Sequence, residues 1–307
     1  MIRSIAREPY SGITERSGKY IPTGLPTIDN SLNDLAPGCV TVIVGRANGG
    51  KTTFVKQITA NAISNGNSVF LVNGENDEEI WLNELYQCVI GRDNKLYNVK
   101  KINKRYHKEP KPETLELLKQ WQGDRLAILS TSKEGLLDID GLFKKIDAWV
   151  YMNDTGLVII DNLMSVLNAK SNEKNEKQAE FVQKCCDIAK RNRCHIVIVV
   201  HPNKEYRKGM EMDFENISGT SDIPNKADNV IAVIREYDQV KIDNGINGKI
   251  AILKNKYYSD IKCCNTHFDT ETGLLCEIAD NGDVIHYNFR LESHITADPE
   301  IYLPFDV

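Results

Sequence analysis

A chain of 307 residues with a net charge of −5 can bury one large α/β domain or two small ones. The acidic balance argues against a protein that coats nucleic acid indiscriminately, but it leaves room for a local basic groove. Eight cysteines without C-x-x-C spacing predict reduced thiols rather than a zinc site. No apolar run is long enough to span a bilayer and no signal peptide opens the chain, so we expect a cytoplasmic protein with no membrane partner.

Apolar runs rich in valine and isoleucine alternate with segments of helical period. The expected strands are 40–44, 68–73, 126–130, 157–160, 195–200, 230–235 and 249–254. The expected helices are 52–64, 78–90, 113–122, 139–152 and 174–193. Because these strands are continuously apolar rather than alternating, the pattern predicts a doubly wound α/β fold whose mostly parallel sheet carries helices on both faces.

The last part of the chain changes character. Turn signals at 243–248, 269–273 and 280–282 separate short strands and predict C-terminal antiparallel hairpins. We expect an N-terminal linker or arm over residues 1–20, one α/β domain over 21–290 and an acidic tail over 291–307. The basic segment 92–111 has two readings, a solvated mobile insertion, which we favour, and a contact with nucleic acid.

Residues 45–52 read Gly-Arg-Ala-Asn-Gly-Gly-Lys-Thr, which is a phosphate-binding loop between a strand and a helix. Its glycines let successive backbone N–H groups converge on phosphate oxygens, and the following helix directs its positive end at the same anion. Lys51 is expected to reach the β- and γ-phosphates and Thr52 to complete a Mg²⁺ shell. The alternative is a glycine-rich turn without a ligand. The predicted nucleotide-binding residues are Gly45, Ala47, Asn48, Gly49, Gly50, Lys51, Thr52 and Thr53.

Three polar residues follow predicted strands, at the sheet edge where ligands bind in such folds. Glu75 can orient or deprotonate a water that attacks the γ-phosphate, or it is simply an acid at the start of a helix. Asp161 follows an apolar run, as the carboxylate that holds the Mg²⁺ water shell does. His201 can bond the γ-phosphate, although a single histidine at a strand end is more often structural.

Basic residues occur in two further places. The segment 202–216 is polar, has too few apolar residues to pack, and is long for a connection in a compact domain. Lys254 and Lys256 stand two residues apart at the end of a strand, so they share one side of the extended chain and can meet a phosphate or only solvent.

Taken in order, these motifs resemble the ATPase domain of the hexameric replicative helicases of the DnaB and Twinkle type, within the RecA-like superfamily, and look most like the phage members. The resemblance runs from about residue 21 to residue 273. It rests on the lead 21–29, the turn Pro37-Gly38, the phosphate loop, the three strand-end residues, and the segments 217–219 and 227–230.

The resemblance implies a role for each matching position. Glu75 would be the catalytic base, Lys51 and His201 would contact the γ-phosphate, and Thr52 with Asp161 would hold Mg²⁺ beside ATP or another NTP. Phe268 would stack on the base. Lys254 and Lys256 would reach the nucleotide site of the neighbouring subunit. The residues implied to contact single-stranded DNA, from the loop 203–216 and its flank, are Asn203, Lys204, Arg207, Lys208, Ser218 and Gly219.

Two departures from the family pattern bear on function. The family usually has arginine at Lys256, and an arginine finger contributes about 10³–10⁵-fold to turnover in related NTPases. If lysine does this less well, turnover is modest or another residue, such as Arg235 or Lys262, assists. The segment before residue 21 is short for the linker helix with which the family clasps the next subunit, and no primase region precedes the domain.

The leading hypothesis is therefore an ATP-driven DNA helicase motor that translocates on single-stranded DNA as a homo-oligomeric ring, expected to be a hexamer, with a separate primase, polymerase or loader as further partners. One alternative is a RecA-like recombinase or a KaiC-like ATPase. The other is a nucleotide-switched replication accessory protein that does not unwind DNA.

Overall fold

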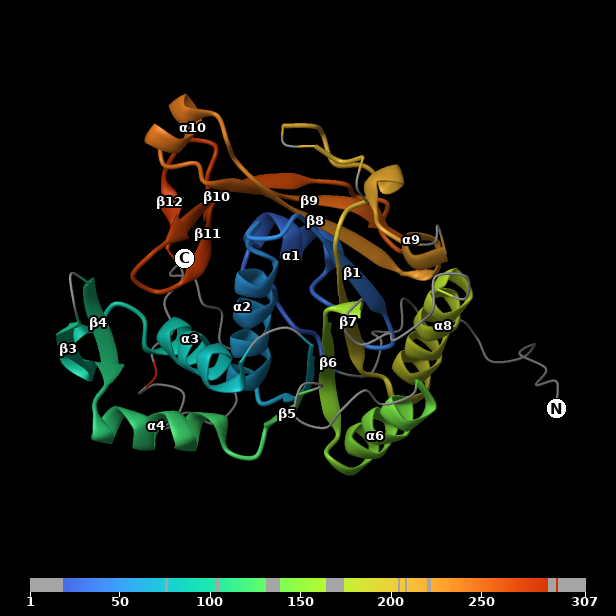
Figure 1. Ribbon diagram of the computed structural model, residues 1–307, viewed down its shortest axis with the longest axis horizontal. Helices are drawn as coiled ribbons and strands as arrows, with labels where there is room; N and C mark the ends of the chain where they lie inside the picture. Colours follow the sequence, from blue (N-terminus) through green and yellow to red (C-terminus); the bar gives the residue numbers. More distant parts are fainter. Residues whose placement is uncertain are drawn as a thin grey trace, which may run out of the picture.

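The computed structural model describes residues 19–74, 77–102, 105–130, 139–163, 174–203, 205–207, 209–219, 222–286 and 291. Within these ranges one large sheet is flanked by helices on both faces (Figure 1). Its strands are β1 (Val40–Val44), β2 (Ser68–Asn73), β5 (Leu126–Ser130), β6 (Thr155–Asp161), β7 (His195–Val200), β8 (Asn229–Arg235), β9 (Gly248–Asn255), β10 (Cys263–Asp269), β11 (Leu274–Ile278) and β12 (Val284–Ile285).

The helices vary in length from a single turn to five. They are α1 (Pro26–Leu32), α2 (Lys51–Ser64), α3 (Glu78–Ile90), α4 (Pro112–Gln122), α6 (Ile139–Met152), α8 (Lys174–Asn192), α9 (Asp222–Lys226) and α10 (Gln239–Asp243), with short 3₁₀ turns η1 (Asn94–Leu96) and η3 (Phe214–Asn216). None of these helices has the length and apolarity that crossing a bilayer requires.

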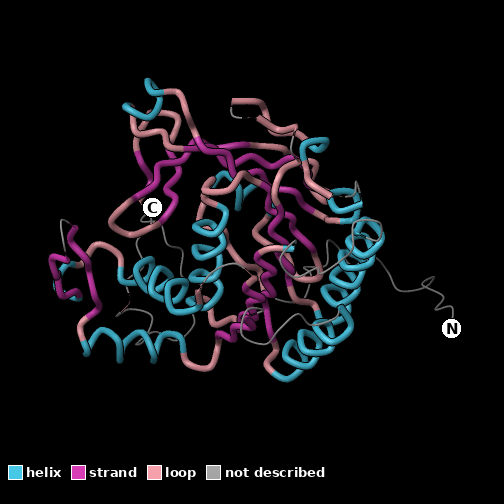
Figure 2. The backbone as a smooth tube through the Cα atoms, in the orientation of Figure 1, coloured by secondary structure: helices cyan, strands magenta, loops and turns pink. Residues whose placement is uncertain are grey.

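The strand order is β12-β11-β10-β9-β8-β1-β7-β6-β2-β5. The six strands from β8 to β5 pair in parallel, whereas β9 to β12 are antiparallel. The predicted fold class is thereby confirmed: a RecA-like, mostly parallel sheet with C-terminal antiparallel hairpins (Figure 2).

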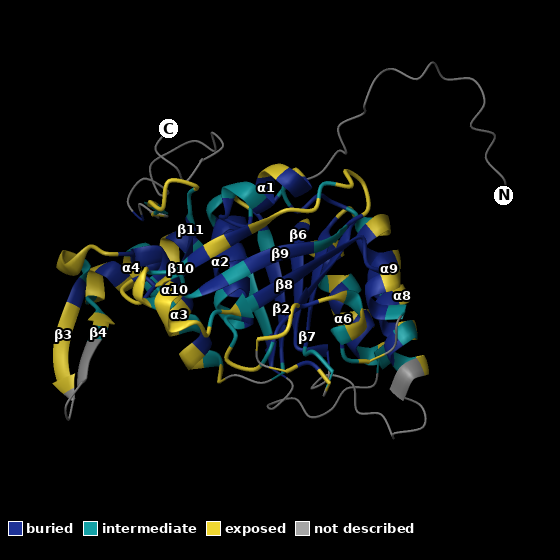
Figure 3. Ribbon diagram, turned by 90° about the horizontal axis from the view of Figure 1, so that it is seen from above, coloured by how far each residue is buried: buried dark blue, intermediate teal, exposed yellow. Residues whose placement is uncertain are grey.

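Both faces of the parallel strands are buried, which explains why their sequences do not alternate between apolar and polar residues (Figure 3). Successive residues point to opposite faces: Ile43 belongs to the core beneath α2 and α3, and its neighbour Val42 to the core beneath α6 and α8. The eight cysteines are all free thiols and most are buried, so they fill space, as expected.

The structure of the basic segment differs from the prediction. The basic segment 92–111, expected as a solvated mobile insertion, contains an antiparallel hairpin of β3 (Tyr97–Ile102) and β4 (Arg105–Pro110). Tyr97 is buried against the end of α3, while Val99 is 55% exposed. The expectation was wrong because backbone pairing between the two strands and the burial of Tyr97 are enough to form this hairpin. The segment lacks the apolar run that indicated the other strands.

The segment that precedes β1 folds around the buried carboxylate of Asp29. The Asp29 carboxylate accepts hydrogen bonds from Thr23 N (2.7 Å), Thr23 Oγ1 (2.6 Å) and Gly24 N (3.0 Å). Gln57 on α2 donates to the carbonyls of Thr23 and Gly24 and accepts from Leu275 N. Burial raises the pKa of Asp29 to about 7. This motif therefore ties the lead and β11 to the helix that follows the phosphate loop.

His195, at the start of β7, is fully buried between two partners. Its Nδ1 lies 2.7 Å from the Ala36 carbonyl and its Nε2 lies 2.9 Å from Thr41 Oγ1. Burial lowers its pKa from 6.5 to about 4. A histidine with a lowered folded-state pKa stabilises the protein above its unfolded pKa and loses that stabilisation as the pH falls toward the folded value.

We therefore expect the contribution of His195 to the free energy of unfolding to fall by about 2 kcal/mol between pH 7 and pH 4.5. Urea unfolding of the wild type and His195→Gln at both pH values measures this, because other titrating groups cancel in the difference. The gap in unfolding free energy between the two proteins should narrow in acid. A gap that stays constant or widens would contradict the buried neutral imidazole.

Candidate nucleotide site

The sheet topology brings together three of the strand ends singled out in the sequence. β1 pairs with β7, and β7 pairs with β6, all in parallel, so their carboxyl ends lie at the same edge. The phosphate loop follows β1, Asp161 ends β6, and His201 follows β7. Neighbouring parallel strands thus place groups that are more than a hundred residues apart in sequence around one point.

Two glycines allow the loop its tight course. A Cβ on Gly45 would lie 2.4 Å from the carbonyl oxygen of Val233 on β8, so the loop packs directly against that strand's backbone. Gly50 precedes the first residue of α2 with φ of 99°, and Asn48 is also left-handed at 58°. α2 then begins at Lys51, which leaves its first N–H groups at the loop.

Lys51 is buried, at 6% exposure, and its ammonium is held inside the loop. Nζ donates to the carbonyls of Gly45 (2.7 Å) and Arg46 (2.9 Å) and lies 3.3 Å from His201 Nδ1. Because an ammonium only donates, Nδ1 is the acceptor in this contact. On the other side of the ring, Asn162 Nδ2 lies 3.0 Å from His201 Nε2.

Thr52, the residue after Lys51, and Asp161 bring two side-chain oxygens together. Thr52 Oγ1 lies 3.3 Å from Asp161 Oδ2, and Asp161 is 2% exposed. A hydroxyl and a carboxylate are ligands that Mg²⁺ accepts, so the residues present fit this ion. Gly74 N donates to the Asp161 carbonyl (2.7 Å), which brings the end of β2 to the same place. Glu75, the predicted base, lies outside the described residues.

These residues line a cavity of about 560 Å³. Phe268, 38% exposed at the end of β10, lies in the same wall, and Arg235 Nη1 donates to the Asn48 carbonyl at 3.3 Å. Sequence reasoning missed Lys56 and Glu84, since neither belongs to a strand-end motif. The predicted residues found in the lining are Ala47, Asn48, Gly49, Gly50, Lys51, Thr52, Thr53, Asp161, His201 and Phe268.

The predicted DNA-binding loop, residues 203–216, starts and ends beside the main chain of His201. Ser218 N donates to the His201 carbonyl (3.0 Å), and Asn203 bonds the Asn216 and Glu215 carbonyls, so the loop closes on itself. Gly219, with φ of 107°, packs against Gln178 of α8. Arg207 is exposed, and Lys204 and Lys208 lie outside the described residues.

One expectation about this loop was wrong. The segment was predicted to have too few apolar residues to pack, yet Tyr206 and Met212 are buried at 7% and 3% exposure. Two apolar side chains are enough because the loop folds back over the core beneath α8. A second hollow of about 400 Å³ lies between the loop and the phosphate loop, with Tyr206, Arg46 and Tyr237 in its wall.

Lys254 and Lys256 lie at the other end of the sheet. Lys254 Nζ donates to the carbonyls of Pro224, Asn225 and Ala227 at 2.8–3.1 Å, so it caps the end of α9. Lys256 Nζ lies 2.9 Å from the buried Asp228 carboxylate. Neither lysine reaches the cavity of its own chain, and their proposed action on a neighbour stays a prediction.

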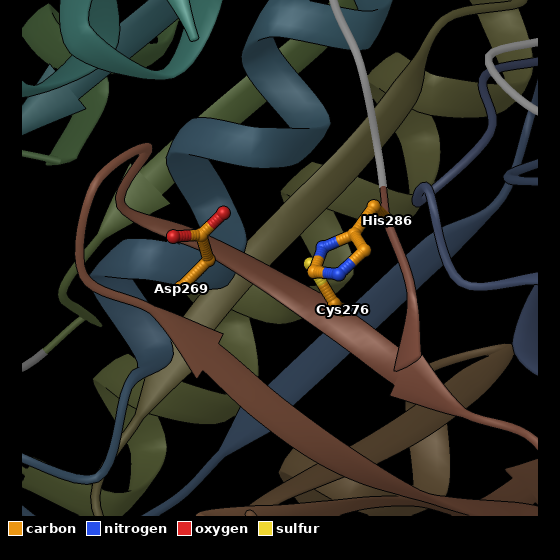
Figure 4. A group of neighbouring side chains, drawn as sticks. All are labelled: Asp269, Cys276 and His286. Carbon is orange, nitrogen blue, oxygen red and sulfur yellow. The ribbon is translucent and has the colours of Figure 1, made fainter. Parts of the chain in front are cut away.

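A second group of side chains, Asp269, Cys276 and His286, has ligand atoms within 4.8 Å of one another (Figure 4). Arg92 Nε donates to Asp269 Oδ2 (3.0 Å), and its Nη2 lies 3.2 Å from His286 Nδ1. Although burial raises the pKa of Asp269, hydrogen bonds from Glu271 N, Thr272 and Arg92 lower it overall. A guanidinium therefore already binds two of the three groups, and this cluster links α3 to the C-terminal strands.

Comparison with known proteins agrees with this geometry. Residues 20–207 match the AAA domain family. The chain belongs to this family of ATPase domains. The match contains the phosphate loop, Asp161 and His201, and covers more than half of the chain.

The chain is also similar to the Twinkle homolog protein, chloroplastic/mitochondrial, of Arabidopsis thaliana, with 24% identity over 223 residues. That alignment covers 71% of the chain but 31% of the plant protein, so the chain spans about a third of this relative.

Solved structures share the fold. One of them, a separately solved ATPase domain, gives a TM-score of 0.66 at 16% identity, over 85% of the chain and 92% of that domain. A DnaB-like replicative helicase, solved with its primase interactions, gives a TM-score of 0.65 at 16% identity, over 83% of the chain and 61% of the helicase. The RadB recombinase gives a TM-score of 0.55 at 16% identity, over 82% of the chain and 97% of the recombinase. The resemblance to the DnaB and Twinkle type that the motifs indicated is thus confirmed.

Proposed function

We propose that the protein is an ATP-driven motor that translocates on single-stranded DNA during replication, with ATP hydrolysed at the interfaces of a ring of like subunits. The observation that carries the proposal is the physical continuity between the nucleotide cavity and the predicted DNA loop. His201 contacts Lys51 through its ring and Ser218 through its carbonyl, so a displacement of the histidine moves the root of the loop.

Each residue of the cavity has a part in this proposal. Lys51 and the loop N–H groups bind the triphosphate, and Thr52 with Asp161 would hold Mg²⁺. That ion, when bound, would neutralise charge on the β- and γ-phosphates. Glu75 orients the attacking water, and His201, already beside Lys51, exchanges that contact for the γ-phosphate and so registers its loss.

The second hollow supports a DNA contact at the same edge. Its wall contains the ring of Tyr237, which is 38% exposed, and the cations Arg46 and Lys249, together with the acids Glu236 and Asp238. Stacking platforms beside cations are how proteins bind single strands without reading sequence. The net charge of −5 is compatible with this, because each subunit of a ring needs few contacts.

A second candidate is an ATPase that does not unwind DNA, either of RecA or KaiC type or a nucleotide-switched replication accessory protein. The likeness to the RadB recombinase and the lysine at position 256 favour it. A separate primase, polymerase or loader as partner belongs to the first candidate, and the primase named with the DnaB-like helicase supports that expectation.

Fork unwinding by the wild type, Lys51→Ala and Glu75→Gln separates the two candidates. We expect unwinding by the wild type alone, and ATP hydrolysis that rises with single-stranded DNA and falls as salt is raised, because phosphate contacts release counterions. Native mass measurement with an ATP analogue and an oligonucleotide tests the ring directly. Hydrolysis that ignores single-stranded DNA at every salt concentration would contradict the motor.

A further inference from the structure

The nucleotide cavity extends past the phosphate loop along α2. Thr52, Thr53 and Lys56 line it in turn, and Lys56 falls on the same face as Thr52, four residues earlier. Glu84 of α3 completes this wall, and its carboxylate accepts a hydrogen bond from Lys56 Nζ. An ion pair therefore forms the part of the wall that lies one helical turn further along α2 than Thr52.

The two partners of this pair differ in exposure. The Lys56 side chain is 8% exposed, whereas that of Glu84 is 53% exposed. A buried lysine holds the carboxylate in place, and a carboxylate has about four lone-pair sites, of which one bond to Lys56 uses only one. The ammonium likewise has three donors. The pair therefore offers a fixed acceptor beside a fixed donor.

Apolar residues of the C-terminal strands also line the cavity: Phe268 from β10, Ile250 on β9 and Leu275 on β11. Leu275 N donates to Gln57, the residue after Lys56, and Leu275 pairs with Phe268, so this apolar wall lies beside the same turn of α2. An aromatic ring with aliphatic neighbours suits the face of a flat heterocycle, and an acceptor–donor pair suits its edge. With the phosphates held at residues 49–52, the base of a nucleotide is the part that would lie against this wall.

We propose that Lys56 and Glu84 read the edge of the nucleobase and select adenine over guanine. Glu84 accepts a hydrogen bond from the 6-amino group, and Lys56 donates to the adjacent ring nitrogen N1. Guanine in the same pose turns its O6 toward the carboxylate and its N1–H toward the ammonium, which sets acceptor against acceptor and donor against donor. This inference rests on the proposed function, because it assigns the base specificity of the same nucleotide site.

The test is competition of ATP and GTP for the full chain, measured with a fluorescent ATP analogue. We expect the wild type to prefer ATP by about tenfold or more. In Glu84→Gln the amide can donate as well as accept, so the preference should fall toward unity. Glu79→Gln, an exposed acid on the same helix outside the cavity lining, is the matched control and should keep the wild-type preference.

The outcomes separate the inference from the proposed function. Wild type that binds both nucleotides equally, or Glu84→Gln that keeps the wild-type ATP/GTP ratio, would overturn the base-reading role while leaving the ATPase intact. Absence of any nucleotide binding by the wild type would overturn the proposed function as well. Thermal unfolding of Glu84→Gln, which keeps the shape of the side chain, identifies any loss of fold.

Discussion

Replacing Lys51 with alanine is expected to reduce ATP hydrolysis by at least about 100-fold, the usual cost of removing one donor that stabilises developing charge in an enclosed site. Its Nζ joins the phosphate loop carbonyls to His201, at 2.7, 2.9 and 3.3 Å, and Lys51 is buried. A triphosphate that enters the cavity offers this ammonium a stronger, charged acceptor than two carbonyls. Hydrolysis and nucleotide affinity should therefore fall together.

The control must separate loss of charge from loss of fold. Removing Lys51 leaves the carbonyls of Gly45 and Arg46 without this donor, which costs about 1–3 kcal/mol where no water replaces it. Thermal unfolding measures that cost directly. Lys119→Ala removes an exposed lysine that pairs with Glu116 on its own helix and should hydrolyse ATP as the wild type does. If Lys51→Ala hydrolyses ATP at the wild-type rate, the role assigned to the phosphate loop is wrong.

The parallel core was predictable because its physics is local. A strand covered on both faces must be apolar throughout, so the runs at 40–44, 68–73 and 195–200 marked their strands residue for residue. Because the strands are parallel, the residues that follow them share an edge, so the sequence alone predicts Asp161 and His201 beside the phosphate loop, where the structure has them.

The contacts that depend on side-chain packing were not predictable. Nothing in the spacing of Lys56 and Glu84, which stand on different helices, indicates that they form an ion pair in the cavity wall. Lys254 looked like a cation displayed on a strand, but its ammonium is satisfied by three carbonyls at the end of α9. Tyr206 anchors a loop whose composition is that of a solvated segment. In each case the partner comes from an element that only the folded chain brings near.

Lys256→Ala is expected to lower DNA-stimulated hydrolysis by about 100-fold or more while leaving nucleotide binding intact, because its ammonium would act on the γ-phosphate of a neighbouring subunit. Lys256 pairs with Asp228, whose other oxygen accepts from Val40 N at the start of β1. The phosphate loop follows the end of β1, five residues and about 15 Å away. Lys256 cannot serve its own cavity.

Mixing Lys51→Ala with Lys256→Ala tests whether Lys256 acts on the nucleotide site of a neighbouring subunit. In a ring with head-to-tail interfaces, a Lys51→Ala subunit still presents Lys256, and a Lys256→Ala subunit still has its phosphate loop. Random mixing should restore about a quarter of the interfaces, so ATP hydrolysis should reappear in the mixture and in neither protein alone. A mixture as inactive as its components would contradict action between subunits.

Two further variants distinguish the role of the charge from its role in the fold. Although burial raises the pKa of Asp228, hydrogen bonds from Lys256 and Val40 N lower it overall, so Lys256→Ala weakens a buried carboxylate's support and its thermal stability must be measured. Lys119→Ala, which removes an exposed lysine that pairs with Glu116 on α4, is the matched control and should stay active. Lys256→Arg keeps the ion pair and adds a planar fork that spans two phosphate oxygens, so its turnover should equal or exceed that of the wild type.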